Sequence, residues 1–158
     1  MNSLQIEKIL TNDRVTKKYF LGVFPSDQLP TKIVCYPACF ICNVDKSTEP
    51  GSHWLAFYLS SPVEAEFFDS YGNEPSYFQG PISNYVSRFS QVMFNPLRLQ
   101  SHTTAVCGQF CVFYIYSRCE GKTLKQFLNE FVSENICNDH RVYNFVTKRY
   151  RILANFYQ

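Results

Sequence analysis

The sequence lacks long apolar runs and has few histidines. No apolar stretch approaches the roughly 20 residues that cross a bilayer, so we expect a soluble protein without a membrane contact. Charged residues begin at Glu7, before any apolar segment of a signal peptide, and we therefore expect no secretory leader. The 3 histidines leave few choices for a general base.

Internal repeats, low-complexity tracts and linkers are also absent, which predicts a single domain over residues 1–158. Apolar residues make up 46% of the chain and charged residues 18%, so one packed core is expected. The net charge of +2 is weak evidence for any partner. A DNA contact is one interpretation of four basic residues near the end, and a solvated helix face is the favoured one: Arg141, Lys148, Arg149 and Arg151.

The 7 cysteines are an odd number in a chain without a predicted leader, which favours free thiols in a reducing compartment over a disulfide framework. Three of them, Cys35, Cys39 and Cys42, precede His53 at spacings that a zinc site tolerates. No second pair of metal-ligand spacing follows, so small buried thiols are the favoured interpretation.

Apolar periodicity predicts an α+β fold, with a central mixed sheet flanked by helices. Strands are expected within 31–44, over 54–59 and 65–69, and around 97–99, the middle two paired as a hairpin. Helices are expected over 3–11 with Ser3 as the cap, over 81–89, from Cys107 to Tyr116, after a capping box at Thr123, and roughly over 141–150. The segment 19–24 is expected to be extended.

The helix expected from Cys107 has almost no polar face, which is typical of a helix buried on all sides. A cysteine in its first turn lies beside unpaired N–H groups and a partial positive charge, and both stabilise a thiolate. Gly108 has no Cβ, so we expect substrate backbone to come close to the sulfur. Our hypothesis is that Cys107 is the nucleophile of a cysteine peptidase.

A thiol nucleophile needs a base and a group that orients the base. His53 lies between a loop and the head of a strand, so it is favoured over His102, which is too near Cys107, and over His140, which lies at an expected helix start. Asp69 ends the neighbouring strand, where its carboxylate can reach the imidazole. The alternative for Asp69 is the start of an ordinary turn, and one residue can serve both purposes.

Gln100 precedes Cys107 across a polar turn and is a candidate oxyanion donor together with the backbone N–H of Cys107. The ordered pattern resembles the adenovirus-type processing peptidases (adenain) and, more distantly, the SUMO-specific peptidases of the same fold. It consists of His53-Trp54, Phe68-Asp69-Ser70-Tyr71-Gly72, Gln100 and Cys107-Gly108. The resemblance implies that His53 is the base, Asp69 its orienting group, Gln100 the oxyanion donor and Cys107 the nucleophile. It also implies that Trp54 packs beside the catalytic ring, so Trp54 and Gly108 are the expected substrate-binding residues.

The resemblance further implies cleavage of viral or virus-like structural precursors near Gly-Gly or Gly-x sites, with no metal or cofactor. The runner-up substrate is the Gly-Gly tail of a ubiquitin-like modifier. Val106 stands where SUMO peptidases usually carry aspartate, which favours the viral branch. We expect a monomer in the host cytoplasm or nucleus, and in the virion as well.

Two departures limit the resemblance. Asp69 stands where the viral enzymes often have glutamate, although the SUMO branch has aspartate, so the role is preserved. No cysteine occurs between Cys42 and Cys107, so the disulfide-joined peptide activator of the adenovirus enzyme is not expected.

Rival interpretations fit less well. Caspases place a histidine about 50 residues before the cysteine, as here, but their glycine stands two residues after the cysteine whereas Gly108 follows directly. Papain-like enzymes have the cysteine first and the histidine later, the reverse order. An inactive binding module would not need base, orienting group, donor and nucleophile together.

Overall fold

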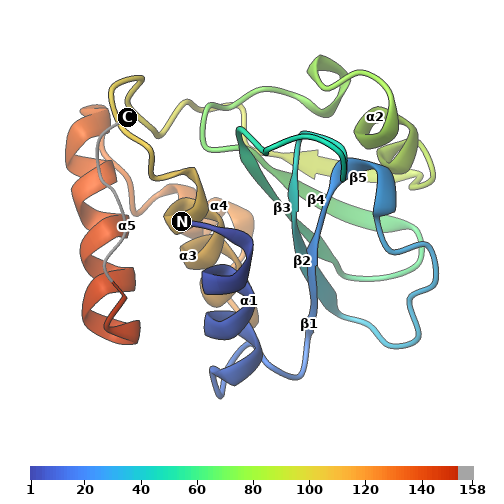
Figure 1. Cartoon of the computed structure of the whole chain (residues 1–158), viewed down its shortest axis with the longest axis horizontal. Coiled ribbons are helices and arrows are strands. Elements are labelled where there is room, and N and C mark those ends of the chain that lie inside the picture. The colour runs from blue at the N-terminus through green and yellow to red at the C-terminus, as the bar shows by residue number, and fades with distance from the viewer. Residues whose placement is uncertain (153–158) are drawn as a thin grey trace.

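A computed structural model describes residues 1–152 of the chain, so residues 153–158 of the predicted domain lie outside the described part. Ten helices and strands make up the described fold (Figure 1), besides two short 3-10 turns at Ser26–Gln28 and Pro75–Tyr77. In chain order they are α1 (Ser3–Asn12), β1 (Phe20–Phe24), β2 (Ala38–Asn43), β3 (Trp54–Leu59), β4 (Glu64–Phe68), α2 (Pro81–Val86), β5 (Gln91–Phe94), α3 (Cys107–Cys119), α4 (Leu124–Leu128) and α5 (Asn135–Tyr150).

The strands form one mixed sheet in the order β1-β2-β3-β4-β5. The two edge pairs, β1 with β2 and β4 with β5, are parallel, and the central pairs are antiparallel. The β3–β4 hairpin aligns Ala56 with Phe68, so His53 before β3 and Asp69 after β4 come out at the same end of the sheet. The predicted hairpin is therefore confirmed, and it positions two of the candidate site residues.

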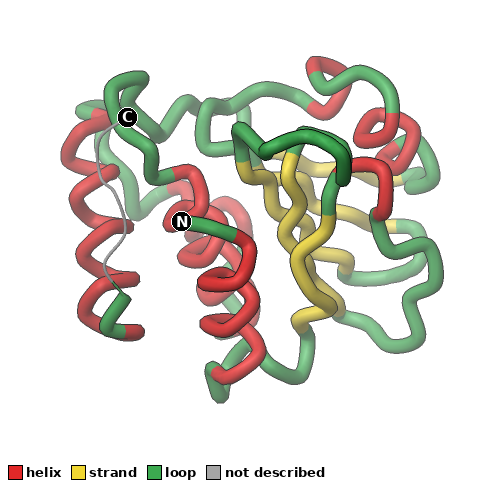
Figure 2. The backbone as a smooth tube through the Cα atoms, viewed as in Figure 1, coloured by secondary structure: helices red, strands yellow, loops and turns green. Residues whose placement is uncertain are grey.

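Helices cover the two faces of the sheet unequally. α1, α3, α4 and α5 lie on one face, and α2 lies on the other (Figures 1 and 2). Successive side chains of β2 alternate between the two faces, because a strand has a period of two. Cys39 and Ile41 join the core under the four helices, whereas Phe40 and Cys42 join the second core beside α2.

α3 is the centre of the helical layer. It packs against β3 and against α5, and its buried residues run from Gly108 to Ser117. Glu66 of β4 accepts hydrogen bonds from Arg118 at 2.7 and 2.8 Å and from Tyr114 at 2.8 Å. This buried ion pair joins the helix that begins at Cys107 to the strand that leads to Asp69. Among residues 1–152, no helix has the length and apolar character needed to cross a membrane.

The prediction of a strand around 97–99 is wrong. The fifth strand is Gln91–Phe94, which pairs with Glu64–Phe67 at the edge of the sheet and has a half-exposed pattern. The chain around Leu97 is irregular, and Leu99 and Gln100 both donate a backbone hydrogen bond to the carbonyl of Ser70. This bonding brings Gln100 to the site without a strand.

Several helix boundaries also differ from expectation. α2 ends at Val86 instead of 89, and α3 continues beyond Tyr116 to Cys119. The cap of α1 is Asn2, whose side chain accepts from the Gln5 N–H at 2.9 Å in a capping box, so Ser3 is the first helical residue. α5 begins at Asn135, several residues before the expected 141. The capping box at Thr123 is confirmed.

Candidate active site

His53 lies directly before β3 at the end of the sheet that carries the site. Its carbonyl accepts a hydrogen bond from the Val44 N–H at 3.0 Å, which continues the β2–β3 ladder and fixes the backbone. Its side chain is 15% exposed, and its ring stacks on Tyr71 with centroids 5.1 Å apart. The imidazole is thus held by the sheet while one edge stays accessible.

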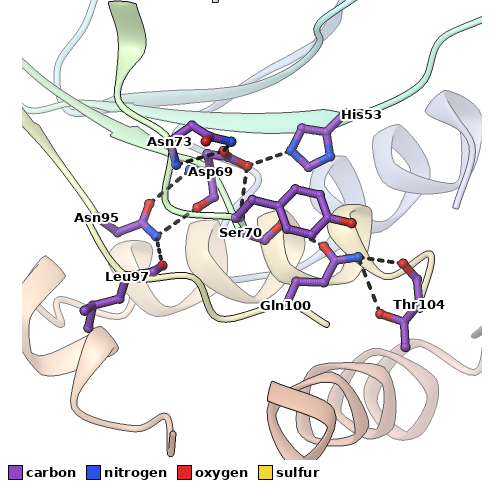
Figure 3. Close-up of polar contacts among 9 residues, drawn as sticks. His53, Asp69, Ser70, Asn73, Asn95, Leu97, Gln100 and Thr104 are labelled. Atoms are coloured by element: carbon purple, nitrogen blue, oxygen red, sulfur yellow. Dashed lines mark hydrogen bonds and ion pairs between the residues drawn. The ribbon is translucent and has the colours of Figure 1, made fainter. Parts of the chain in front are cut away.

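Asp69 follows β4 and is fully buried. Its Oδ1 accepts from His53 Nε2 at 2.6 Å and from the Tyr71 N–H at 3.1 Å. Its Oδ2 accepts from Asn73, through the backbone N–H at 3.1 Å and the side chain at 2.7 Å (Figure 3). Four hydrogen bonds therefore hold the carboxylate, and they offset the cost of burying it.

Cys107 is the first residue of α3, as expected. Burial opposes ionisation of its thiol, but a hydrogen bond with the His53 side chain, the charge of His53 and the Trp54 backbone N–H outweigh burial, so the pKa of Cys107 lies below its usual value. No side chain among residues 1–152 caps the N-terminus of α3. The N–H groups of its first turn, and the partial positive charge there, can therefore stabilise an anion.

His53 changes in the opposite direction. Burial alone would lower its pKa, but the hydrogen bonds to Asp69 and Cys107 and the negative charge of both partners raise the pKa of His53 to about 9. Since Nε2 is bound to Asp69, Nδ1 is the ring nitrogen left for the thiol. The two shifts favour an imidazolium beside a thiolate over the neutral pair of imidazole and thiol.

Gln100 is buried and its side-chain amide is held at both ends. Its Oε1 accepts from the Ser70 hydroxyl at 2.7 Å, and its Nε2 donates to the Thr104 carbonyl at 2.8 Å (Figure 3). Gln100 and Cys107 line the same cavity. Nε2 also makes a longer contact of 3.5 Å with the Thr104 hydroxyl oxygen. The short bond uses one proton of Nε2, and the amide carries a second proton that can be donated to an oxyanion.

Two cavities meet at Cys107. One, of about 620 Å³, is lined by Trp54 and by the loop that precedes His53. The other, of about 420 Å³, is lined by His53, Tyr71 and Gln100. Both include Cys107, so an extended chain that passes over the sulfur can occupy one cavity on each side.

Trp54 and Gly108 have different surroundings. Trp54 lines the larger cavity, and its indole N–H donates to the Met1 carbonyl at 3.1 Å. Gly108 is buried and is not among the described residues that line either cavity. A Cβ there would approach Met1 Cβ and Trp54 Cδ1 to 3.2 Å, so the space that glycine leaves is used by Trp54. The role of Gly108 in substrate binding stays a prediction, and the structure gives this position a packing role beside Trp54.

The structure adds residues that sequence reasoning missed. Asn95 is fully buried, and its side chain accepts from the Asp69 N–H at 3.0 Å and donates to the Asp69 carbonyl at 2.8 Å. It thereby continues the β4–β5 pairing by one residue and fixes the backbone of Asp69. Asn73 lies in the turn expected after Asp69, so its role had a signal in the sequence. Nothing local in the sequence indicates Asn95, and Ser70 lies in the quoted pattern without a role assigned to it.

The alternative zinc site does not form. Cys39 and Cys42 lie in the cores on opposite faces of the sheet, and Cys35 is exposed. Within residues 1–152, no group of three or more histidine, cysteine or acidic side chains is arranged to hold a metal ion. Cys39 instead lies 3.8 Å, sulfur to sulfur, from Cys119.

Comparison with known proteins gives the relationship. No protein-family model matches the chain. A cysteine protease S273R of African swine fever virus is 28% identical over 126 residues, which cover 71% of this chain and 43% of the relative. Over this region the chain is similar in sequence to S273R. A second isolate's protein, a SUMO-1 cysteine protease S273R, is 27% identical over the same shares.

The solved structures agree on the fold. The crystal structure of ASFV pS273R protease has a TM-score of 0.59 at 19% identity, over 89% of this chain and 65% of that one. A selenomethionine form gives a TM-score of 0.56 at 20% identity, over 90% and 66%. The α+β fold and the resemblance to this superfamily of cysteine peptidases are thus confirmed. The chain spans 43% of the length of the S273R relatives it matches, so their activity does not pass to it by homology alone.

Proposed function

We propose that this protein is a cysteine endopeptidase in which Cys107 is the nucleophile and His53 the general acid and base. The observation that carries the proposal is that these two side chains line one cavity at the start of α3, where they change each other's pKa in opposite directions. Asp69 orients the ring by binding Nε2, and Gln100 supplies an oxyanion donor. The S273R homologues, which are cysteine proteases, support this assignment.

Acylation starts from the ion pair. The Cys107 thiolate attacks the carbonyl carbon of the scissile peptide, and a C–S bond forms as the carbonyl π electrons move to oxygen. The amide of Gln100 and the backbone N–H of Cys107 stabilise that oxyanion. His53 then donates its proton to the leaving nitrogen, the C–N bond breaks, and a thioester with a free amine remains.

Deacylation uses the same groups in reverse roles. Neutral His53 takes a proton from water, and the resulting hydroxide equivalent attacks the thioester. The second oxyanion collapses with cleavage of the C–S bond, which releases the acid and restores the thiolate beside imidazolium. Asp69 stays ionised and keeps the ring in place throughout.

The proposed substrates are structural precursors of a virus or virus-like element, cleaved near Gly-Gly or Gly-x sites. Homology to a viral protease supports the source. The indole of Trp54 over the start of α3 and the small Ala105 beside Cys107 favour a substrate with little side chain next to the scissile bond.

A second candidate is removal of a ubiquitin-like modifier from its conjugates. The relative described as a SUMO-1 cysteine protease favours it, and such modifiers also end in Gly-Gly. The two candidates share the chemistry at Cys107 and differ in what binds beyond the scissile bond.

The test is a comparison of two substrates. Purified protein is incubated with a library of precursor-derived peptides containing Gly-Gly or Gly-x, and separately with SUMO and ubiquitin carrying a C-terminal thiol-reactive group. We expect peptide cleavage that Cys107→Ala abolishes. Labelling of Cys107 by the modifier probes without peptide cleavage would overturn the precursor assignment. The absence of both reactions would overturn the peptidase proposal.

We also propose that the enzyme acts as a monomer in a reducing intracellular compartment, the host cytoplasm or nucleus, and in the virion. All 7 cysteines are free, and the nucleophile must stay reduced to react. We propose no disulfide-joined activator, because the chain has no cysteine between Cys42 and Cys107 to which an activator peptide could be joined. Size-exclusion chromatography and activity with and without a reductant test these points.

A further inference from the structure

Asp139 of α5 is a fully buried carboxyl group that the proposed mechanism does not use. Its oxygens accept from the Ser101 N–H at 3.2 and 3.3 Å and from the Thr104 hydroxyl at 2.8 Å. Burial raises the pKa of the Asp139 carboxyl, and the bonds from Thr104 and Ser101 and the charge of His140 lower it by less. A neutral side chain would avoid this cost, so the position calls for a reason.

Both partners of Asp139 belong to the loop between Gln100 and Cys107. The carbonyl of Thr104, whose hydroxyl binds Asp139, accepts from Gln100 Nε2 at 2.8 Å. The direction of the Gln100 amide therefore depends on where Thr104 is held. Nε2 also lies 3.5 Å from the Thr104 hydroxyl oxygen, so the position of Thr104 sets the directions of both N–H bonds of the amide.

A neighbouring residue of α5 holds the other side of Gln100. Asn138 is buried and donates to the Leu99 carbonyl at 3.2 Å and to the Val132 carbonyl at 2.8 Å. The first turns of α5 therefore contact the chain both before and after Gln100. The segment has no regular secondary structure of its own, so these contacts replace a strand or helix as its support.

We infer that Asp139 is a positioning residue for the oxyanion hole, which holds Thr104 and through it the Gln100 amide. The inference rests on the proposed peptidase function. It predicts that Asp139 affects stabilisation of the oxyanion and leaves the Cys107–His53 ion pair unchanged, because its partners lie on the Gln100 side of the site.

Three reactions distinguish an effect on oxyanion stabilisation from an effect on the Cys107–His53 ion pair. Iodoacetamide alkylates the thiolate and forms no oxyanion, so it reports the ion pair. A Gly-Gly peptide aldehyde adds the thiol to form a hemithioacetal whose oxygen occupies the oxyanion position. Turnover of a Gly-Gly peptide gives kcat and KM.

For Asp139→Ala we expect kcat to fall about 10-fold with little change in KM, and aldehyde binding to weaken by a similar factor. The alkylation rate of Cys107 should stay within about twofold. Asp139→Asn keeps one acceptor oxygen and should recover part of the loss. Thr104→Val keeps the carbonyl and removes the hydroxyl, so a smaller effect of the same kind is expected, and this variant serves if Asp139→Ala does not fold.

A double-mutant cycle with Gln100 shows whether the effect passes through the amide. Gln100→Ala should cost roughly 10²- to 10³-fold in kcat, as loss of an oxyanion donor does elsewhere. In that background Asp139→Ala should cost little more. An undiminished 10-fold loss there would overturn the inference.

Asp13→Ala is the matched control. Asp13 is also a buried carboxylate that contacts α5, where it binds Arg149 at 2.8 Å, and it accepts from the Val15 N–H at 2.8 Å. It caps the C-terminal end of α1, whereas the opposite end of that helix lines the cavity at Cys107. We expect it to lower stability without lowering kcat. Equal losses of kcat in both variants, or a parallel fall in alkylation for Asp139→Ala, would overturn the inference.

The behaviour of the wild type separates this inference from the proposed function. A wild type that binds the aldehyde without cleaving peptides overturns the endopeptidase proposal alone, and the comparison of aldehyde binding still tests the role of Asp139. A wild type that does neither overturns both.

Discussion

The two halves of the site are supported by different parts of the molecule. His53 and Asp69 stand at adjacent ends of β3 and β4, and Asn95 after β5 fixes the backbone of Asp69. Gln100 stands on an irregular segment that is held from outside by α5, through Asp139. The base half is thus a product of strand pairing, and the oxyanion half is a product of contacts between segments distant in the sequence.

This difference predicts how each half fails. A change in the base half alters the ionisation of Cys107 and His53 and therefore every reaction of the thiolate. A change in the oxyanion half alters only reactions that form an oxyanion. Alkylation and peptide turnover, measured on the same variants, distinguish the two.

The largest effect is expected for His53→Ala. Without imidazolium the thiolate loses its partner and the leaving amine its acid, so kcat/KM should fall by roughly 10³-fold or more. Alkylation of Cys107 at pH 7 should fall as well, because the pKa of the thiol rises when His53 is removed. Both rates are measured on the same preparation, and an unchanged alkylation rate would contradict the ion pair.

Asp69→Asn should have the next largest effect, seen best as a pH profile. Activity needs the thiolate, present above the lowered pKa of Cys107, and the imidazolium, present below the His53 pKa of about 9. The wild-type profile is therefore a bell that declines on its alkaline side near pH 9. Without the carboxylate charge this limb should move down by about 1 to 3 pH units, with kcat lower by roughly 10²-fold. A limb that stays in place would show that Asp69 does not act on the ring.

Asn95→Ala should give the smallest effect on activity and a clear one on stability. It leaves the buried N–H and carbonyl of Asp69 without their partners, which costs about 1–3 kcal/mol of unfolding free energy. Since Asp69 keeps its bonds to Asn73, we expect kcat/KM to fall about 10-fold or less. Chemical denaturation and turnover measure the two effects, with exposed Asn84→Ala as the control. Equal stability of the two variants would refute the structural role of Asn95.

The same difference explains what the sequence could predict. The β3–β4 hairpin was predictable because two apolar runs flank a turn, and the pairing places His53 beside Asp69. The helix from Cys107 was predictable because its apolar residues leave no polar face. The superfamily resemblance rested on the same residues.

The support of Gln100 was not predictable from local pattern. β5 has only four residues, too few for a clear alternating pattern, and Leu97 and Leu99 suggested a strand that does not form. The first five residues of α5 include Asn135, Asn138 and Asp139, whose side chains favour caps and turns over helix interiors. Asn138 and Asp139 use that polarity to bind chain 99–104, which only the tertiary structure reveals.

The most direct test of the account is the rate at which each thiol reacts with iodoacetamide near pH 7, located by mass spectrometry. The exposed Cys35 and Cys137 in the same chain serve as internal references. We predict that Cys107 reacts much faster than both and that His53→Ala removes this advantage. Equal, slow labelling of all three thiols in the wild type, or a fast Cys107 that persists in His53→Ala, would contradict the central claim.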